Sequence, residues 1–298
     1  MVDRRRLLPR GYFRAVDIPA YLRVVTSDSL EIAVYDLGGA GPNVLMAHAT
    51  GFHGRIFAPL ASELADRFHA FSFDERGHGD SASPRNRDFS WNGFAADVLA
   101  VVESVGAPLL AIGHSAGAAA LLLAEQQRPG TFRGLYCWEP VMFPSDPPMG
   151  HQMGNFLAEG ARKRREIFAS RDEAFQNFSS KLPFSSLFPS ALHAYVDYGF
   201  RDLPDGSVRL KCDRDDEALV YENGGVHDAF THLSEVKCPT TIACGEKTQA
   251  LGPVIIRGFA ERMPDAKAIV VPDLGHFGPL EDPVAVAESI KEAFNGLG

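Results

Sequence analysis

The sequence lacks the patterns that would point to metal, redox or nucleotide chemistry. Its four cysteines are not arranged in a C-x-x-C pair, so the sequence indicates neither a zinc site nor a thioredoxin-like motif. Free, reduced thiols are typical of a cytoplasmic protein, and we expect that location. No G-x-x-x-x-G-K pattern occurs either. We therefore expect a protein that works without a metal or an organic cofactor. The cysteines are Cys137, Cys212, Cys238 and Cys244.

Long apolar runs and an excess of positive charge are also missing. The arginines at positions 4–6 are followed by a stretch that Pro9 and Arg10 interrupt, so the sequence predicts no signal peptide and no membrane span. There are 29 Lys and Arg against 38 Asp and Glu, a net charge of -9, which argues against a nucleic-acid partner. The four cations at positions 162–165 are interpreted as a solvated helix face.

What is present is typical of a soluble α/β enzyme. The chain has 298 residues, of which 45% are hydrophobic and 22% charged, enough for one large domain or two small ones. Two extended segments at 21–25 and 30–35 predict an antiparallel hairpin. After residue 43, short apolar runs alternate with amphipathic stretches, which indicates βαβ units on a parallel sheet. The further strands are expected at 44–47, 70–73, 109–112, 135–138, 240–243 and 268–271, and the helices at 57–67, 91–105, 116–127, 253–263 and 283–294.

The alternation fails between Pro140 and Cys238. This segment shows almost no strand pattern and has helical periods at 156–168 and 171–178. A structureless connection of about a hundred residues is improbable in a compact domain. We therefore expect a helical lid or cap at 141–237, inserted into a core domain made of 1–140 and 238–298.

The most specific motif is Gly113-His114-Ser115-Ala116-Gly117. It matches G-x-S-x-G, directly after an apolar run and directly before an Ala-rich stretch that favours a helix. A strand-to-helix turn this sharp strains the serine backbone, and the flanking glycines leave room for it. Ser115 would stand at a helix N-terminus, where negative charge is stabilised. The alternative interpretation is an ordinary helix N-cap. We interpret Ser115 as a catalytic nucleophile.

A serine nucleophile needs a base with a pKa near 7 within hydrogen-bonding reach. Among ten histidines, His276 follows the last expected strand and precedes the last helix, which places it at the sheet edge where Ser115 is expected. His114 is expected to point away from the serine, and His48 to be a structural hydrogen-bonding residue. We therefore interpret His276 as the general base.

Taken together, these segments resemble the α/β-hydrolase family over residues 20–298. The resemblance rests on His48-Ala49-Thr50-Gly51 after one strand, the 74–81 segment Asp-Glu-Arg-Gly-His-Gly-Asp-Ser after the next, the Ser115 motif, the helical insertion and a late Gly275-His276. It implies a mostly parallel eight-stranded sheet with helices on both faces and a cap over the active site. The reactions it implies are hydrolysis of ester, thioester, amide, lactone or carbon–carbon bonds.

The third member of a catalytic triad departs from the commonest family pattern. The resemblance places an aspartate in a Gly-x-x-Asp turn, where this chain has Thr248. A neutral hydroxyl cannot balance an imidazolium charge, so a carboxylate must come from elsewhere. Glu139 ends the sixth strand, as in haloalkane dehalogenase-like and zearalenone hydrolase-like members, and we interpret it as the triad acid. Glu246 is the reserve candidate.

An oxyanion also needs two backbone N–H donors. The residue after the nucleophile, Ala116, supplies one. The resemblance places the other in the loop at 48–51, where we choose Thr50 ahead of Gly51. The segment at 74–81 carries acids and a histidine, yet its family counterpart is a structural turn, and we interpret it so.

Aromatic side chains in the insertion indicate an apolar substrate pocket, although most of them are expected to form helix core. We expect a hydrolase that cleaves a small hydrophobic ester or lactone through an acyl-enzyme, with a carbon–carbon hydrolase, a perhydrolase or a non-catalytic binding protein as alternatives. The sequence leaves the oligomeric state open, a homodimer included. The aromatic residues are Phe143, Phe156, Phe168, Phe175, Phe178, Phe184, Phe188, Tyr195, Tyr198 and Phe200.

Overall fold

The computed structural model describes residues 22–107, 109–144, 149–224 and 226–297. The arginines at 4–6 and the first residue of the expected hairpin, Tyr21, lie outside the described residues. Every expected strand from 30 onward and every expected core helix has a counterpart in the structure, with ends that differ by a few residues.

The core is an eight-stranded sheet in the order β1-β2-β4-β3-β5-β6-β10-β11. β2 runs antiparallel to both of its neighbours, and the six strands from β4 to β11 are parallel. The expected α/β-hydrolase sheet is therefore confirmed. The strands are β1 (Leu22–Val25), β2 (Glu31–Gly39), β3 (Asn43–Ala47), β4 (His69–Phe73), β5 (Leu109–His114), β6 (Phe132–Trp138), β10 (Thr240–Gly245) and β11 (Ala266–Val271).

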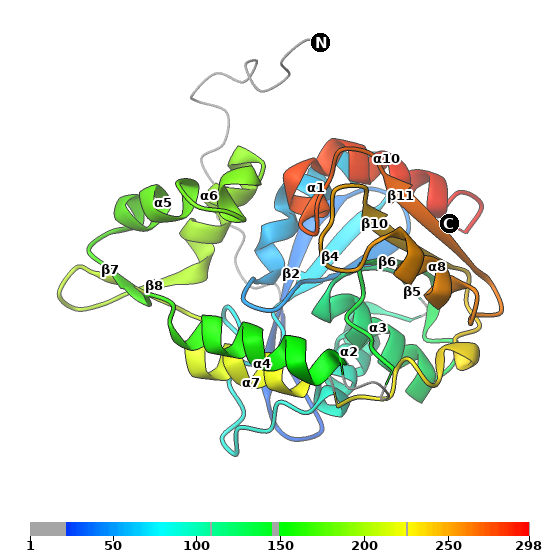
Figure 1. Ribbon diagram of the computed structural model, residues 1–298, viewed down its shortest axis with the longest axis horizontal. Helices are drawn as coiled ribbons and strands as arrows, with labels where there is room; N and C mark the ends of the chain where they lie inside the picture. The colour runs from blue at the N-terminus through cyan, green and yellow to red at the C-terminus, as the bar shows by residue number, and fades with distance from the viewer. Residues whose placement is uncertain (1–21, 108, 145–148, 225, 298) are drawn as a thin grey trace, which may run out of the picture.

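Helices cover both faces of this sheet (Figure 1). On one face, α2 (Trp91–Val105), α3 (Ala116–Gln127) and α8 (Pro253–Ala260) bury residues such as Val98, Leu121 and Phe259 in one apolar cluster. On the other face, α1 (Ala58–Leu64) and α10 (Pro283–Ala293) bury Leu60 and Ile290 in a second cluster. β5 is buried along its whole length, as expected for a central parallel strand.

The segment between β6 and β10 forms a separate group of helices beside the sheet (Figure 1). It contains α4 (Met149–Arg162), α5 (Arg171–Ser179), α6 (Pro189–Gly199), α7 (Arg214–Asn223) and the short helix η3 (Phe184–Ser186). Its aromatic side chains, among them Phe178 and Tyr195, join the apolar cluster on the α1 side of the sheet.

Two expectations for this segment were wrong. A helix was expected at 156–168, but α4 ends at Arg162, and a small antiparallel sheet of β7 (Ile167–Phe168), β9 (Val208–Leu210) and β8 (Phe200–Asp202) follows. These strands have two or three residues each, too few to show an alternating pattern in the sequence.

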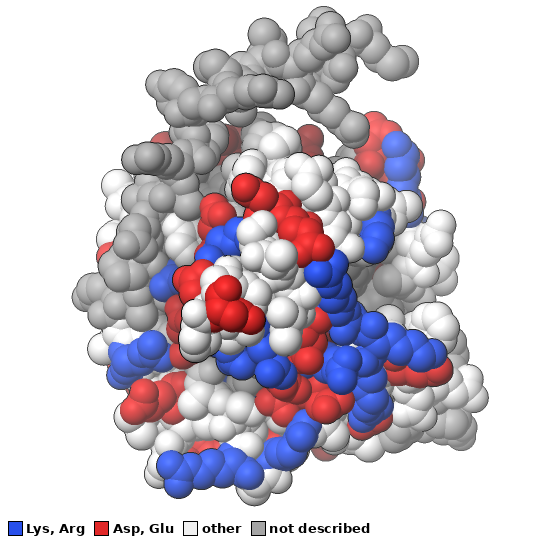
Figure 2. All heavy atoms as spheres, turned by 90° about the vertical axis from the view of Figure 1, so that its left-hand side faces the viewer, with Lys and Arg blue, Asp and Glu red and all other residues white. Residues whose placement is uncertain are grey.

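The second wrong expectation concerns the four cations at 162–165. Arg162, Lys163 and Arg165 form surface ion pairs, and acidic and basic side chains alternate on this face of the molecule (Figure 2). Arg164 is different, because its side chain is only 22% exposed and pairs with the buried Glu217. The interpretation as a solvated helix face is therefore wrong for Arg164.

The four cysteines lie within the described ranges, and each is buried and unpaired. Among the helices in the described part of the chain, none combines the length and the apolar character that crossing a membrane requires.

Candidate active site

Ser115 occupies a strained turn between β5 and α3. Its φ of 55° and ψ of -111° lie in a region that side chains other than glycine rarely adopt. The flanking glycines are required by close contacts: a Cβ at Gly113 would lie 2.4 Å from Ala118 Cα, and one at Gly117 would lie 2.3 Å from the Ala47 carbonyl oxygen. The Ser115 N–H donates to the carbonyl of Trp138 at 2.8 Å, which ties the turn to the end of β6.

The same end of β6 positions a carboxylate against His276. The His276 Nδ1 lies 2.7 Å from Glu139 Oε2. Because a carboxylate only accepts, Nδ1 carries the proton and donates it in this bond. The bond therefore selects the tautomer in which Nε2 keeps its lone pair, as a general base requires.

Glu139 is fully buried, and its environment compensates for the loss of water. Oε1 accepts from the Gly245 N–H at 3.2 Å, and Oε2 accepts from the Thr248 hydroxyl at 2.8 Å and, more weakly, from the Leu251 N–H at 3.4 Å. Hydrogen bonds of this kind stabilise a buried anion. The φ of Glu139 is 44°, a second non-glycine residue in the left-handed region beside the site.

Thr248 therefore stands beside the carboxylate and donates to it. In the sequence, Thr248 marks the position where the family pattern has an aspartate. Glu246, the reserve acid, has an exposed side chain and accepts from the Asp273 N–H at 3.2 Å. Within the described residues, the carboxylate that contacts His276 is that of Glu139.

Two side chains, which the sequence did not predict as contacts, bind the backbone carbonyl of His276. Trp138 Nε1 donates to the His276 carbonyl at 2.8 Å, and His114 Nε2 donates to the same oxygen at 3.0 Å. His114 was expected only to point away from the serine. The pairing of His114 with Trp138 in the β5–β6 register explains why both reach one atom. Burial lowers the pKa of His114 well below its ordinary value.

The two expected oxyanion donors lie in segments that contact each other. The Gly117 N–H, next to Ala116, donates to the His48 carbonyl at 3.0 Å, which joins the Ser115 turn to the loop at 48–51. Within the described part of the chain, the N–H groups of Thr50 and Ala116 have no hydrogen-bond acceptor. Donors left free in this way can bind an incoming oxyanion.

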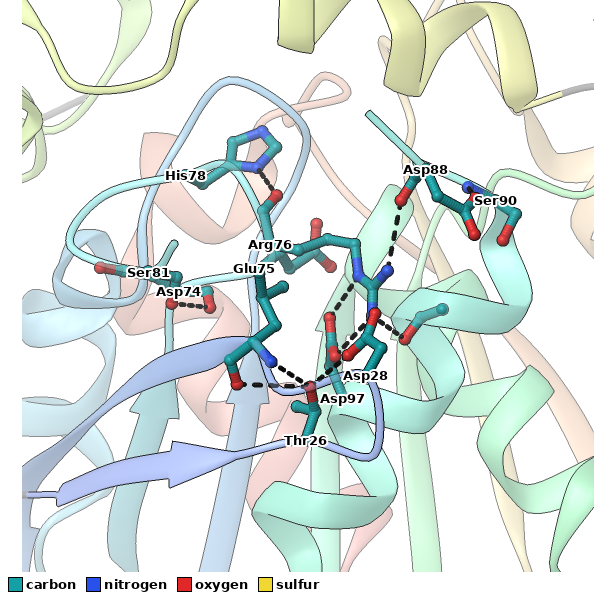
Figure 3. Close-up of polar contacts among 12 residues, drawn as sticks. Thr26, Asp28, Asp74, Glu75, Arg76, His78, Ser81, Asp88, Ser90 and Asp97 are labelled. Atoms are coloured by element: carbon teal, nitrogen blue, oxygen red, sulfur yellow. Dashed lines mark hydrogen bonds and ion pairs between the residues drawn. The ribbon is translucent and has the colours of Figure 1, made fainter. Parts of the chain in front are cut away.

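The segment at 74–81 forms a dense turn, as expected. Asp74 Oδ1 accepts from the Gly54 N–H and Oδ2 from the Asp80 N–H, both at 2.6 Å. The Ser81 hydroxyl donates to the Asp74 carbonyl at 2.6 Å (Figure 3). Arg76 forms a buried pair with Asp97. These contacts account for Asp74, Arg76 and Ser81 as structural residues. Within the described residues, the buried Glu75 carboxylate has no hydrogen-bond partner, and burial raises its pKa well above the ordinary value.

Aromatic rings extend from His276 toward the inserted segment. The Phe277 ring lies 5.0 Å from the His276 ring and 5.7 Å from Phe52, measured between centroids. Phe52 in turn contacts Phe184 at 5.8 Å and Tyr195 at 5.4 Å. Phe168, Phe178 and Phe200 of the insertion pack on one another, whereas Phe156 is exposed.

Groups of three or more His, Cys, Asp or Glu that could hold a metal ion are absent from the described ranges.

Comparison with known proteins gives the family. The model of the alpha/beta hydrolase family matches residues 44–289. The chain belongs to the α/β-hydrolase family. The matched range contains the Ser115 turn, Glu139 and His276, and it includes the inserted segment.

Two curated relatives of this α/β-hydrolase are named as an esterase and a hydrolase. It is 42% identical over 251 residues to the pimeloyl-[acyl-carrier protein] methyl ester esterase of Chromobacterium violaceum, covering 80% of this chain and 88% of that protein. It is 22% identical over 241 residues to the 2-(acetamidomethylene)succinate hydrolase of Mesorhizobium japonicum, covering 80% and 83%. A crystal structure of E-2-(acetamidomethylene)succinate hydrolase shares the fold, with a TM-score of 0.79, 21% identity and coverage of 92% and 98%.

Proposed function

We propose that this α/β-hydrolase cleaves a hydrophobic carboxylic ester or lactone through an acyl-enzyme on Ser115. The observation that carries the proposal is the bond between His276 Nδ1 and the buried Glu139 carboxylate. Glu139 directly follows Trp138, whose carbonyl accepts from the N–H of the strained Ser115 at the N-terminus of α3. That arrangement supplies a nucleophile, a base in the required tautomer and a charge that stabilises the imidazolium.

In the first half of the reaction, Ser115 Oγ attacks the carbonyl carbon while its proton passes to His276 Nε2. The carbonyl oxygen gains the negative charge and accepts hydrogen bonds from the N–H groups of Ala116 and Thr50. The carbon–oxygen bond to the alcohol then breaks, and His276 returns the proton to the leaving oxygen. The product of this half is an ester of Ser115 and a free alcohol.

In the second half, water replaces the alcohol. His276 takes a proton from the water, the hydroxide adds to the acyl carbon, and the bond to Ser115 Oγ breaks as the serine regains its proton. Glu139 keeps the His276 ring in position and balances its charge in both halves, without taking the proton itself.

The preference for an apolar substrate rests on the aromatic rings next to the base. Phe277 and Phe52 connect His276 to Phe184 and Tyr195 of the inserted segment. Ligand sites are usually lined by such side chains with few polar groups. We propose that residues 141–237 form a cap over the site and that these rings bind the acyl or alcohol group.

A panel of esters graded in chain length tests this proposal. We expect kcat/KM to rise with acyl length over short to medium chains, and hydrolysis to stop in Ser115→Ala. A preference for short charged esters would contradict the apolar pocket. A folded wild-type protein that binds esters without turnover would instead support a non-catalytic binding protein, and chromatographic detection of carbon–carbon cleavage products would reassign the reaction.

A further inference from the structure

Two buried histidines outside the proposed triad form hydrogen bonds at the loop 48–51, of which one, His48, is the first residue. The His48 and His78 side chains are at most 1% exposed, and their ring centroids are 5.2 Å apart in an edge-to-face arrangement. Neither ring contacts His276 through any described hydrogen bond. Their bonds go instead to the loop and to the turn at 74–81.

His78 accepts a hydrogen bond from the Gly51 N–H of the loop. Its Nδ1 lies 3.0 Å from the Arg76 carbonyl (Figure 3), and since a carbonyl only accepts, Nδ1 carries the proton. The remaining nitrogen, Nε2, therefore has a lone pair, and it accepts from the Gly51 N–H at 3.0 Å. The Gly51 donor is thus occupied.

His48 secures the start of the loop in the same tautomer. Its Nδ1 donates to the Ala49 carbonyl at 2.8 Å, and its Nε2 accepts from the Glu75 N–H at 3.0 Å. Burial lowers the pKa of His48 to about 4 and that of His78 to about 3, so both rings are neutral near pH 7. Only a neutral ring has the lone pair that these bonds need.

The turn that supports His78 is itself rigid. The Arg76 guanidinium donates to both carboxylate oxygens of Asp97 at 2.7 Å, and to the carbonyls of Gly93 at 3.0 Å and Asp88 at 3.2 Å (Figure 3). A bidentate buried pair of this type fixes geometry well. His78 is therefore attached to a part of the core that has little freedom to move.

Two residues of the inserted segment, Arg164 and Glu217, lie against the other side of the loop. A Cβ at Gly51 would lie 2.6 Å from Glu217 Oε1 and 3.2 Å from a terminal nitrogen of Arg164, and the φ of Gly51 is 81°. The loop is thus enclosed between His78 and the Arg164–Glu217 pair. Within the described residues, the neighbouring Thr50 N–H has no acceptor.

We propose that His78 is a positioning residue for the oxyanion site, which occupies the Gly51 N–H and thereby leaves Thr50, and not Gly51, as the donor to the substrate carbonyl. The proposal rests on the proposed function, because it concerns the oxyanion of the acyl-transfer reaction. His78 acts through the backbone of the loop and does not touch the substrate.

Two substitutions distinguish the hydrogen bond of His78 to Gly51 from its hydrogen bond to Arg76. In His78→Gln the amide oxygen reaches the position of Nε2 and can still accept from Gly51. In His78→Asn the amide reaches only the position of Nδ1, so the contact with Arg76 is kept and the bond to Gly51 is lost. His232→Gln, at a surface histidine paired with Glu235, is the matched control.

The readout is the ratio of kcat/KM for an ester and its thionoester, in which sulfur replaces the carbonyl oxygen. Sulfur is larger and accepts hydrogen bonds weakly, so this ratio reports on the oxyanion donors and not on general folding. We expect His78→Asn to lower kcat/KM for the oxygen ester about 100-fold, since a misplaced donor costs about that much. The thionoester rate should fall far less, and His78→Gln should stay close to the wild-type ratio. Equal losses on both substrates, or a wild-type ratio in His78→Asn, would overturn the proposal.

A second measurement uses the folded wild-type protein and does not depend on any His78 variant. With 15N-labelled threonine and glycine, we expect the Thr50 amide signal to move strongly when a phosphonate forms a tetrahedral adduct on Ser115, while the Gly51 signal stays in place. Movement of Gly51 alone would overturn the proposal. Failure of the wild type to form the adduct or to hydrolyse esters would instead count against the proposed function.

Discussion

Glu139 and His276 are 137 residues apart in the chain, and their side chains meet in a hydrogen bond of 2.7 Å. Glu139 ends β6, whereas His276 follows β11, with β10 between these two strands in the sheet. Thr248, which follows β10, donates to the same Glu139 oxygen that accepts from His276. The carboxylate is therefore supplied from one strand and supported from the next.

Replacement of the carboxylate should abolish most of the activity. In Glu139→Gln, the amide can donate to His276 Nδ1 and so stabilises the wrong tautomer, which leaves Nε2 protonated. We expect kcat to fall by about 10⁴, as is seen when a triad acid becomes an amide. Steady-state kinetics on an activated ester measures this.

Glu246→Gln is the control for that substitution. Its side chain is exposed and bonds to the Asp273 N–H, so we expect activity close to the wild type. If Glu246→Gln lost activity and Glu139→Gln kept it, the acid would have to be reassigned.

The contact between Trp138 and the His276 carbonyl should contribute to kcat. Trp138→Phe keeps an aromatic ring but removes the N–H donor at 2.8 Å, while the His114 bond remains. We expect kcat to fall roughly three- to tenfold with little change in KM, since a neutral hydrogen bond contributes about 1 kcal/mol. Trp91→Phe is a matched control, because within the described residues the buried Trp91 Nε1 has no partner. Equal losses of kcat in both variants would show that ring volume matters and the bond does not.

The buried neutral histidines should make the protein less stable in acid. Burial lowers the pKa of His48 to about 4 and that of His78 to about 3, below the unfolded value of about 6.5. The unfolded state therefore binds more protons, and the stability present above pH 6.5 is lost as pH falls toward 4. Each histidine accounts for at most about 1.4 kcal/mol per pH unit. Denaturant unfolding between pH 7 and 4 measures the slope, which should be shallower in His78→Gln; identical slopes would contradict the assignment.

Much of the fold could be predicted because its signals are local and periodic. The helices at Trp91–Val105 and Ala116–Gln127 occupy the expected residues, and the second begins directly after the turn that holds Ser115 between two glycines. The strands β7, β8 and β9 could not be predicted, because two or three residues carry no measurable period. The prediction of a solvated Arg164 was wrong for a similar reason, because a run of cations does not show which side chain pairs with a buried carboxylate such as Glu217.

Part of the candidate site could also be predicted from the sequence, and part could not. Ser115 and His276 stand in motifs whose position along the chain indicates the chemistry, and Glu139 was found by its place at the end of a strand. The contacts of His114, Trp138 and His78 could not be read from the sequence, because each depends on a backbone atom of a distant segment. The strand register that pairs His114 with Trp138 was the one available signal, and it requires the sheet order to be known.

The central claim is that Ser115 is a nucleophile activated by His276. A fluorophosphonate probe tests it directly, because the serine oxygen forms a bond to phosphorus as fluoride leaves, and His276 accepts the serine proton. Intact-protein mass spectrometry should show one adduct on the wild type, located at Ser115 by peptide mapping, none on Ser115→Ala, and slow formation on His276→Ala. A folded wild-type protein that takes no label, or one labelled equally well after Ser115→Ala, would contradict the account.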